Sequence, residues 1–340
     1  MRSWLKWAAA AATSLALLGG PAAAQDSFYA GKTITLIVPA SAGGSYGIYA
    51  QLVADALTKH IPGNPQVLPQ YVGGAGGMRA SNQVANTAET DGTVIYLMHQ
   101  NAPSQQLLSP DQVSYDAGKF IPIGVISALN SAMAIRNDAP ATDLAGFKQK
   151  EVLIGTTGRG SYQYVIPTLL NSFQDTKFKV ITTYPGTGET MLAVDRGEVH
   201  GMLSSLLTFQ ESRPDWVTGK GDAKLVFQIG ETRDPAIPDV PLLRELAASD
   251  EEKQLYRFMS AANSIGRGLV FPAGVPEDRV AMVRTALQEV LKDPDFQALA
   301  KKRGIPLSSA SAEEMKTIID GILATPKEVV EKARQYMTEG

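Results

Sequence analysis

The sequence Lys32-Thr33-Ile34-Thr35-Leu36-Ile37-Val38-Pro39 is followed at once by Ala40-Ser41-Ala42-Gly43-Gly44-Ser45. The β-branched and apolar side chains of residues 33–38 predict a buried or half-buried strand, which Pro39 ends. Apolar residues then recur at helical spacing over residues 46–60. A strand, a loop of small residues and a helix in this order predict one unit of an α/β fold.

Strands alternate with helices along much of the remaining chain. The further strands are predicted at residues 66–71, 93–98, 120–127, 131–135, 151–155, 179–184, 199–203 and 225–229, and the helices at 78–88, 162–173, 189–195, 242–247, 251–261, 277–292, 294–303 and beyond 313. This alternation predicts parallel, doubly wound sheets. Weak shifts in composition near Asn130 and Thr232 indicate two crossings between domains, with a ligand cleft between them.

The first 24 residues have the features of a secretion signal. Arg2 and Lys6 precede an apolar run over residues 8–18, and Ala22-Ala23-Ala24 supplies a small-residue cleavage site. We therefore expect a mature chain that begins near Gln25 and resides in the periplasm. An uncleaved N-terminal membrane anchor is the alternative, although the run is short for a membrane span.

Composition excludes several classes of function. Removing Arg2 and Lys6 from the 31 basic residues leaves 29 against 34 acidic ones, a net charge of −5, which disfavours nucleic-acid binding. The chain has no cysteine, so it has no disulfide, thiol nucleophile or thiolate-bound metal. We expect no metal and no cofactor. Any anion must be attracted locally, because the overall charge is negative.

Three loops share a design that suits an anion. Each follows a strand, contains Gly, Ser or Thr, and opens a helix, whose first amides have no partner within the helix. The residues are Ser41, Ala42, Gly43, Gly44 and Ser45; Thr156, Thr157, Gly158, Arg159, Gly160 and Ser161; and Gly186, Thr187 and Gly188. A single loop of this kind is often only a tight connection, but three of them in two domains favour a binding function. A fourth loop, residues 73–77, lacks the Lys-Ser/Thr of a P-loop, which disfavours nucleotide binding.

At these residues the chain resembles the substrate-binding receptors of tripartite tricarboxylate transporters, the TctC or Bug family. The resemblance covers nearly the whole mature chain and includes residues 32–44, 73–77, 91–93, 155–161, 184–187, 196–199 and 271–276. It implies a periplasmic-binding-protein-like fold (Venus flytrap, type II), with two doubly wound α/β lobes joined by two cross-strands. Lobe 1 would comprise residues 25–128 plus 232–340, and lobe 2 residues 129–231.

The resemblance also implies a function. Such receptors hold carboxylates mainly through backbone amides of both lobes and deliver them to a membrane permease. Three positions depart from the family pattern: Gly47 stands where an Asp is usual, Gln51 where an Arg is usual, and His200 where the family has Asp. Loss of the carboxylate at position 47 removes a partner for a ligand ammonium group, so we expect a ligand without an amine.

Individual side chains have two interpretations each. Arg159 is either a bidentate partner of a ligand carboxylate or a solvated surface residue. Tyr46 and Tyr162 either pack against the ligand or only support a helix start. His99 and His200 are either cleft residues or structural ones.

The three histidines are far apart and no HExxH occurs, which disfavours a hydrolase or transferase. We therefore expect a monomeric binding protein and not an enzyme. Its expected partners are a small organic carboxylate and the permease subunits of a tripartite transporter. Two alternatives remain open at this point: a receptor that presents its closed form to a sensor kinase, and a secreted enzyme.

Overall fold

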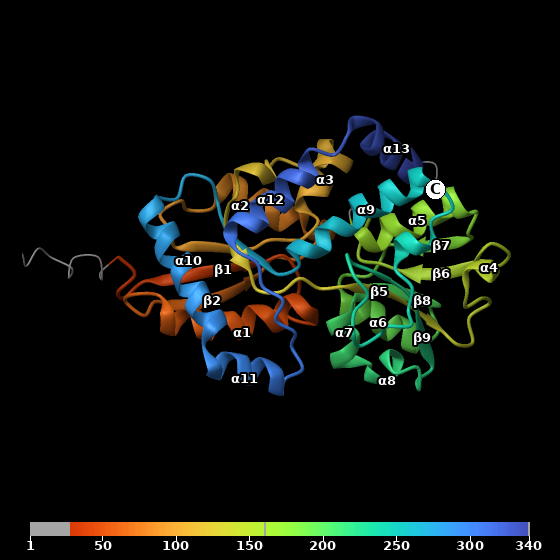
Figure 1. The fold of residues 1–340 in the computed structure, drawn as a ribbon, viewed down its shortest axis with the longest axis horizontal. Helices are drawn as coiled ribbons and strands as arrows, with labels where there is room; N and C mark the ends of the chain where they lie inside the picture. Colours follow the sequence, from red (N-terminus) through yellow and green to blue (C-terminus); the bar gives the residue numbers. More distant parts are fainter. Residues whose placement is uncertain (1–27, 160, 339–340) are drawn as a thin grey trace, which may run out of the picture.

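The structure, a computed structural model, describes residues 28–159 and 161–338. It contains two five-stranded sheets that lie side by side with helices around each (Figure 1). The predicted signal segment and its cleavage site lie outside the described residues. Within these residues no helix is both long enough and apolar enough to cross a membrane.

The strands and helices have the following bounds. The strands are β1 (Thr33–Val38), β2 (Gln66–Tyr71), β3 (Val94–Leu97), β4 (Ile121–Val125), β5 (Ser131–Arg136), β6 (Val152–Gly155), β7 (Phe178–Ile181), β8 (Gly201–Ser205), β9 (Ala223–Ile229) and β10 (Gly268–Phe271). The α-helices are α1 (Gly44–His60), α2 (Met78–Thr87), α3 (Ala102–Leu108), α4 (Leu144–Phe147), α5 (Tyr162–Gln174), α6 (Thr187–Asp195), α7 (Leu206–Ser212), α8 (Pro214–Val217), α9 (Asp250–Ile265), α10 (Glu277–Lys292), α11 (Pro294–Lys302), α12 (Ala312–Leu323) and α13 (Lys327–Thr338). Short 3₁₀ helices are η1 (Ala75–Gly77), η2 (Pro110–Gln112), η3 (Ala117–Lys119) and η4 (Leu243–Leu246).

Both sheets have the same arrangement of strands. The first has the order β2-β1-β3-β10-β4 and the second the order β7-β6-β8-β5-β9. In each, the first three strands are parallel and the fourth is antiparallel to both neighbours. The sequence predicted purely parallel sheets. The antiparallel strands arise because β5 and β10 are the first strands formed after the chain crosses from one lobe to the other.

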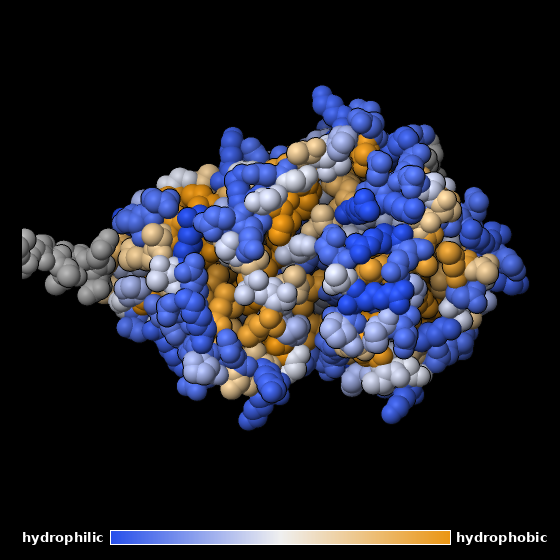
Figure 2. All heavy atoms as spheres, viewed as in Figure 1, coloured by the Kyte–Doolittle hydropathy of each residue, from blue (hydrophilic) through white to orange (hydrophobic). Residues whose placement is uncertain are grey.

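Amphipathic helices cover the sheets. In α10, for example, Val280, Val283 and Leu287 are buried against the first sheet, while charged residues face outward. Figure 2 shows hydrophilic side chains along α10 and α11 and hydrophobic ones between the helices. One core cluster lies within the second lobe, and another lies in the first lobe and includes Leu207 of α7. A third joins residues of both lobes with α9 and α12. The lobes therefore share apolar core in addition to the connecting chain.

The two crossings lie next to each other and are tied by Asn263 of α9. Its side-chain amide donates to the carbonyl of Ile229, at the end of β9, at 2.7 Å, and to the Ser131 hydroxyl, at the start of β5, at 3.4 Å. Its oxygen accepts from the Gln100 amide of the first lobe at 3.0 Å. One buried side chain thus connects both crossings to the loop that follows β3.

The second crossing begins later than the sequence predicted. Residues 232–246 still pack on the second lobe, because the Gln228 amide donates to the carbonyls of Ile237 (3.1 Å) and Val240 (2.7 Å). The chain returns to the first lobe through α9. The predicted boundary after residue 231 therefore differs from the structure, in which this irregular segment follows the edge of β9.

Candidate functional site

A pocket opens between the lobes at the carboxyl ends of the parallel strands, where α/β sheets bind ligands. It measures about 790 Å³, counting space open to solvent. The lining residues, which define the interlobe pocket, are Pro39, Ala40, Ser41, Gly43, Gly44, Ser45, Tyr46, Gly73, Gly74, Gly76, Gly77, His99, Gln100, Thr157, Ser161, Tyr162, Gln163, Pro185, Gly186, Thr187, Ser204, Ser205, Thr208 and Arg267.

Four helices of eight or more residues begin at this pocket without a capping side chain. They are α1, α2, α5 and α6, whose N-cap residues are Gly43, Gly77, Ser161 and Gly186. The first amides of such helices lack partners within the helix, and each helix dipole favours an anion by about 0.3–1 kcal/mol. Because α1 and α2 belong to one lobe and α5 and α6 to the other, both walls favour negative charge.

The loop before α1 turns more tightly than a side chain at position 47 would allow. A Cβ atom on Gly47 would lie 1.8 Å from the Ala42 carbonyl oxygen. The backbone itself therefore excludes an Asp at this position, which gives a structural reason for the departure seen in the sequence. Gly44 also has a left-handed backbone, with φ of 77°, which favours glycine.

Arg267 supplies the charge of the pocket. Its side chain is 2% exposed, and it lies directly before β10, whose antiparallel pairing with β3 brings it to the pocket. It is the only Lys or Arg among the lining residues, and none of them is Asp or Glu. Its Nη1 donates to the Gln100 side-chain oxygen (2.8 Å) and to the Gly266 carbonyl (2.9 Å), and its Nη2 donates to the Ser45 hydroxyl.

No carboxylate pairs with this guanidinium anywhere in the described part of the chain. Its Nε is buried and has no hydrogen-bond partner among the described residues. A buried charge without a counter-ion is costly, and nearly all buried charges in proteins are paired. The arrangement therefore favours an anion in the pocket beside Arg267.

Tyr46 lies between Arg267 and His99. The guanidinium carbon of Arg267 is 3.8 Å from the centre of the Tyr46 ring, and the His99 ring stacks near it at 5.5 Å and 13°. Burial, and then the nearby Arg267 guanidinium, lower the pKa of His99 to about 3. His99 is therefore neutral near pH 7 and adds no positive charge to the pocket.

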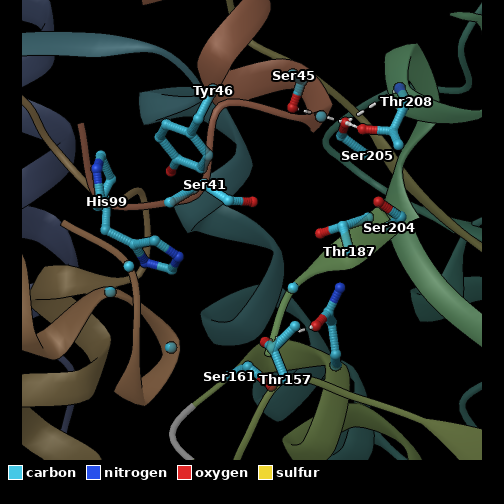
Figure 3. A pocket seen from close by; sticks show the side chains of 18 of the residues that line it. Ser41, Ser45, Tyr46, His99, Thr157, Ser161, Thr187, Ser204, Ser205 and Thr208 are labelled. Carbon is cyan, nitrogen blue, oxygen red and sulfur yellow. Dashed lines mark hydrogen bonds between the residues drawn. The ribbon is translucent and has the colours of Figure 1, made fainter. Parts of the chain in front are cut away.

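Hydroxyl groups join the lobes at the other wall (Figure 3). The Ser205 hydroxyl donates to the Ser45 hydroxyl across the lobes at 2.9 Å. Ser205 also lies 2.9 Å from the Thr208 hydroxyl and caps α7 by accepting from the Thr208 amide. Ser45 thus receives one hydrogen bond from each side, from Arg267 in its own lobe and from Ser205 in the other.

The second-lobe loop is held by Gln163. The Gln163 amide donates to the Leu203 carbonyl at 2.6 Å, and its oxygen accepts from the Thr157 hydroxyl at 3.0 Å. The Ser161 hydroxyl bonds to the Thr156 hydroxyl at 2.8 Å and to the Gly158 carbonyl at 2.7 Å. These contacts fix the loop before α5 next to the end of β8.

The structure places most of the predicted site residues together. Those that line the interlobe pocket are Ser41, Gly43, Gly44, Ser45, Tyr46, His99, Thr157, Ser161, Tyr162, Gly186 and Thr187. Ala42, Thr156 and Gly158 support the loops but do not line the pocket, and Gly160 lies outside the described residues. Arg159 is exposed, with its guanidinium carbon 5.9 Å from the centre of the Tyr164 ring, and it does not line the pocket either.

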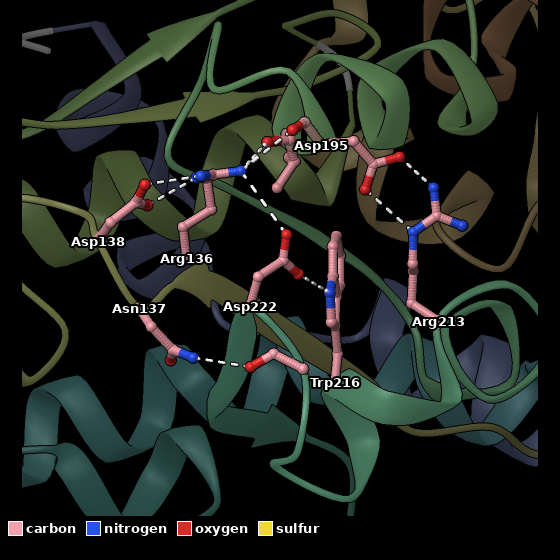
Figure 4. Close-up of polar contacts among 9 residues, drawn as sticks. Arg136, Asn137, Asp138, Asp195, Arg213, Trp216 and Asp222 are labelled. Carbon is pink, nitrogen blue, oxygen red and sulfur yellow. Dashed lines mark hydrogen bonds and ion pairs between the residues drawn. The ribbon is translucent and has the colours of Figure 1, made fainter.

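His200 lies at the wrong end of its strand for a ligand residue. It directly precedes β8, whereas Ser204 and Ser205 at the other end of β8 line the pocket. Its Nδ1 accepts from the Leu153 amide at 2.9 Å, and its carbonyl accepts from the amide of Arg136 at 2.8 Å. Arg136 belongs to a network of ion pairs around Trp216 in the second lobe (Figure 4). His200 was predicted as a ligand residue, but it does not line the interlobe pocket.

Sequence reasoning missed about half of the lining. The sequence disfavours a nucleotide site at the Gly73–Gly77 loop, yet this loop lines the pocket, and its Gly77 lies directly against the His99 ring. Ser204, Ser205 and Thr208 follow a predicted strand, so the same rule that found the other loops applies to them. Arg267 has no such signal, since it precedes its strand.

A model of the TctC family, described as "Tripartite tricarboxylate transporter family receptor", matches residues 49–334. The chain belongs to this family. As a TctC receptor it is a substrate-binding protein and not an enzyme, and the family is one of periplasmic binding proteins. It is 28% identical over 277 residues to the UPF0065 protein encoded in the TAR-I ttuE-ttuC' intergenic region of Agrobacterium vitis, covering 80% of this chain and 73% of that protein.

A UPF0065 protein of Bordetella bronchiseptica is 25% identical over 300 residues, with 86% of this chain and 81% of that one covered. Among solved structures, periplasmic binding protein BugD has a TM-score of 0.72 at 23% identity, over 90% of this chain and 98% of that one. MatC from Rhodopseudomonas palustris with bound malate has a TM-score of 0.69 at 23% identity, over 88% and 99%. These likenesses confirm the predicted periplasmic-binding-protein-like fold.

Proposed function

We propose that this TctC receptor captures a small organic anion of the carboxylate type, without an ammonium group, in the interlobe pocket. The observation that carries this proposal is the buried Arg267, which has no carboxylate partner in the described chain and lies beside four helix N-termini. Each of these features lowers the free energy of a bound anion, and together they cover both walls of the pocket.

The absence of acidic lining residues supports a ligand without an amine. None of the described lining residues is Asp or Glu, and the backbone at Gly47 leaves no room for one there. An ammonium group in the pocket would lose its hydration and lie near the Arg267 charge without a counter-ion. Two structural relatives from Rhodopseudomonas palustris were solved with malate and with adipate, which are acids of this class.

The proposal extends to location and partners. The segment 1–24, with cleavage near Ala24-Gln25, would export the chain to the periplasm. There a monomeric receptor would deliver its ligand to the membrane permease subunits of a tripartite transporter. Closure of the lobes on the ligand would be the form that the permease recognises.

Thermal unfolding with a panel of acids tests the ligand class. The panel contains succinate, malate, glutarate and adipate, with aspartate and glutamate as amino-acid counterparts. A ligand at 100 times its Kd adds about 2.7 kcal/mol to the free energy of unfolding, so we expect Tm to rise by several degrees for at least one diacid. Isothermal titration calorimetry then measures the Kd. A rise in Tm only with the amino acids, or with none of the acids, would contradict the proposal.

A further inference from the structure

The Ser45 hydroxyl has only one way left to form a hydrogen bond with a ligand. It is 4% exposed, lies in the first turn of α1 and lines the interlobe pocket. A hydroxyl has two acceptor lone pairs and one proton to donate. Which of these faces the ligand is decided by the neighbours of Ser45.

Both lone pairs of Ser45 are occupied by protein donors. Arg267 can only donate, because a guanidinium has no acceptor, so its contact with Ser45 uses one lone pair. Ser205 donates to Ser45 at 2.9 Å and uses the other. Among the described residues no acceptor is found for the Ser45 proton. That proton is therefore available to the pocket.

The neighbouring hydroxyl groups agree with this direction. Since Ser205 has spent its single proton on Ser45, the 2.9 Å contact between Ser205 and Thr208 is donated by Thr208. The row of donors thus runs from Thr208 to Ser205 to Ser45. At its end the permanent charge of Arg267 polarises the Ser45 hydroxyl, which strengthens it as a donor.

We propose that Ser45 is a specificity-determining residue, whose hydroxyl donates to a ligand oxygen that carries no proton. A charged carboxylate oxygen fulfils this requirement most strongly, and an amide carbonyl oxygen does so more weakly because it is neutral. An ammonium or amide N–H would meet a second donor. This inference rests on the proposed function, because it assigns the ligand chemistry of the same pocket. Under this inference, the receptor selects a ligand that accepts a hydrogen bond at Ser45 through the direction of the Ser45 hydroxyl as well as through the charge of Arg267.

The selectivity depends on the two lobes being together. Ser45 belongs to the first lobe and Ser205 to the second, so separation of the lobes removes one donor and frees a lone pair of Ser45. The open receptor would then offer both a donor and an acceptor at this point. Only the closed receptor discriminates, which makes the selective state the one that holds the ligand.

Calorimetry on variants of the full mature chain tests this inference. The probes are whichever of succinate, malate, glutarate and adipate binds the wild-type protein most tightly, and the monoamide of that acid. Hydrogen bonds to charged groups are worth more than neutral ones, so Ser45→Ala should weaken the diacid roughly 10- to 100-fold. The monoamide should lose much less, and the preference for the diacid should shrink by about tenfold.

Ser205→Ala provides a second, independent variant. It frees a lone pair of Ser45 without removing the Ser45 proton, so the affinity for the monoamide should rise relative to the affinity for the diacid. Ser260→Ala is the control, because Ser260 is a buried serine of α9 that does not line the pocket. Its affinities should match those of the wild-type protein.

The outcomes separate this inference from the proposed function. If the wild-type protein binds a diacid but Ser45→Ala and Ser205→Ala keep its preference over the monoamide, the role of Ser45 is refuted and the function stands. If no diacid binds the wild-type protein, both are refuted. If Ser45→Ala does not unfold cooperatively, the ratio of affinities in Ser205→Ala decides the question.

Discussion

The Arg267 guanidinium stacks on the face of Tyr46, with 3.8 Å between the guanidinium carbon and the ring centre. A neutral ring attracts a cation without cancelling its charge. The hydrogen bonds of Arg267 to Gln100, Gly266 and Ser45 likewise come from neutral groups. The pocket therefore orients a full positive charge and leaves it uncompensated until a ligand arrives.

Replacement of Arg267 should abolish anion binding. In Arg267→Met the charge is lost while much of the side-chain volume is kept, and we expect the affinity for the best diacid to fall at least about 100-fold. Arg267→Lys should recover only part of it, because an ammonium group does not reproduce the planar guanidinium on Tyr46. Calorimetry measures both. The control is Arg233→Met, which removes an exposed arginine of the second lobe and should bind the diacid with the wild-type Kd. A wild-type Kd in Arg267→Met would contradict the assignment of Arg267 to the anion site.

His99 should make the fold sensitive to acid. Its pKa is about 3 in the folded protein, against a usual value of 6.5, so the unfolded chain takes up a proton that the folded one does not. The resulting stability is complete above about pH 6.5 and is lost as the pH falls toward 3. Between pH 7 and pH 5 this costs about 2 kcal/mol.

Urea denaturation at pH 7 and pH 5 measures this effect. The His99→Gln variant has no imidazole at this position, so its free energy of unfolding should fall by about 2 kcal/mol less than that of the wild-type protein between these pH values. Equal losses in both proteins would show that His99 does not stay neutral in the fold.

A large side chain at Gly44 should prevent closure of the lobes. A Cβ atom there would already lie 3.8 Å from the Thr208 hydroxyl and 4.0 Å from the Thr187 Cβ, both in the opposite lobe. The left-handed backbone at Gly44 adds strain of roughly 1 kcal/mol for any other residue. We expect Gly44→Leu to lower diacid affinity at least about 100-fold while the protein still unfolds cooperatively.

The matched control for Gly44 is Gly321→Ala in α12, where an added Cβ meets no atom within 4 Å. Its affinity and its unfolding should both be close to those of the wild-type protein. Unchanged calorimetric affinity in Gly44→Leu would place the ligand elsewhere.

Loss of the Asn263 side chain should destabilise the junction of the lobes. In Asn263→Ala the Ile229 carbonyl and the Gln100 amide lose their buried partners, which should lower the free energy of unfolding by about 2 kcal/mol or more. Asn137→Ala is the control, because the exposed Asn137 side chain also donates to a backbone carbonyl, that of Gly221. It should cost less than about 1 kcal/mol. Equal effects of the two substitutions in urea denaturation would contradict the role of Asn263.

Most of the fold was predictable because its local patterns agree with its tertiary structure. Strands β1 and β2 and helix α10 have the predicted bounds, since each has a clear apolar pattern between Pro, Gly or charged residues. Strand β10 was missed because Gly268–Phe271 is only four residues long and its pairing is set by β3 and β4. Helices α3 and α7 were missed because seven residues give little periodicity.

The site was predictable only where it follows a general rule. Loops after parallel strands point to the pocket, and this rule located Ser45, Thr157 and Thr187. This rule does not identify Arg267, because an antiparallel strand brings its first residue, and not its last, to the same edge of the sheet. The same geometry keeps His200 away from the pocket, because His200 precedes the parallel strand β8 and the pocket lies at the other end of that strand.

The repeated strand order in the two sheets has a consequence for how ligand preference changes over evolutionary time. Each half supplies one wall of the pocket, so substitutions among the lining residues of one wall leave the other wall unchanged. New solute preferences in such a receptor can therefore arise from mutations confined to the second lobe, with the capture of negative charge preserved by Arg267 of the first.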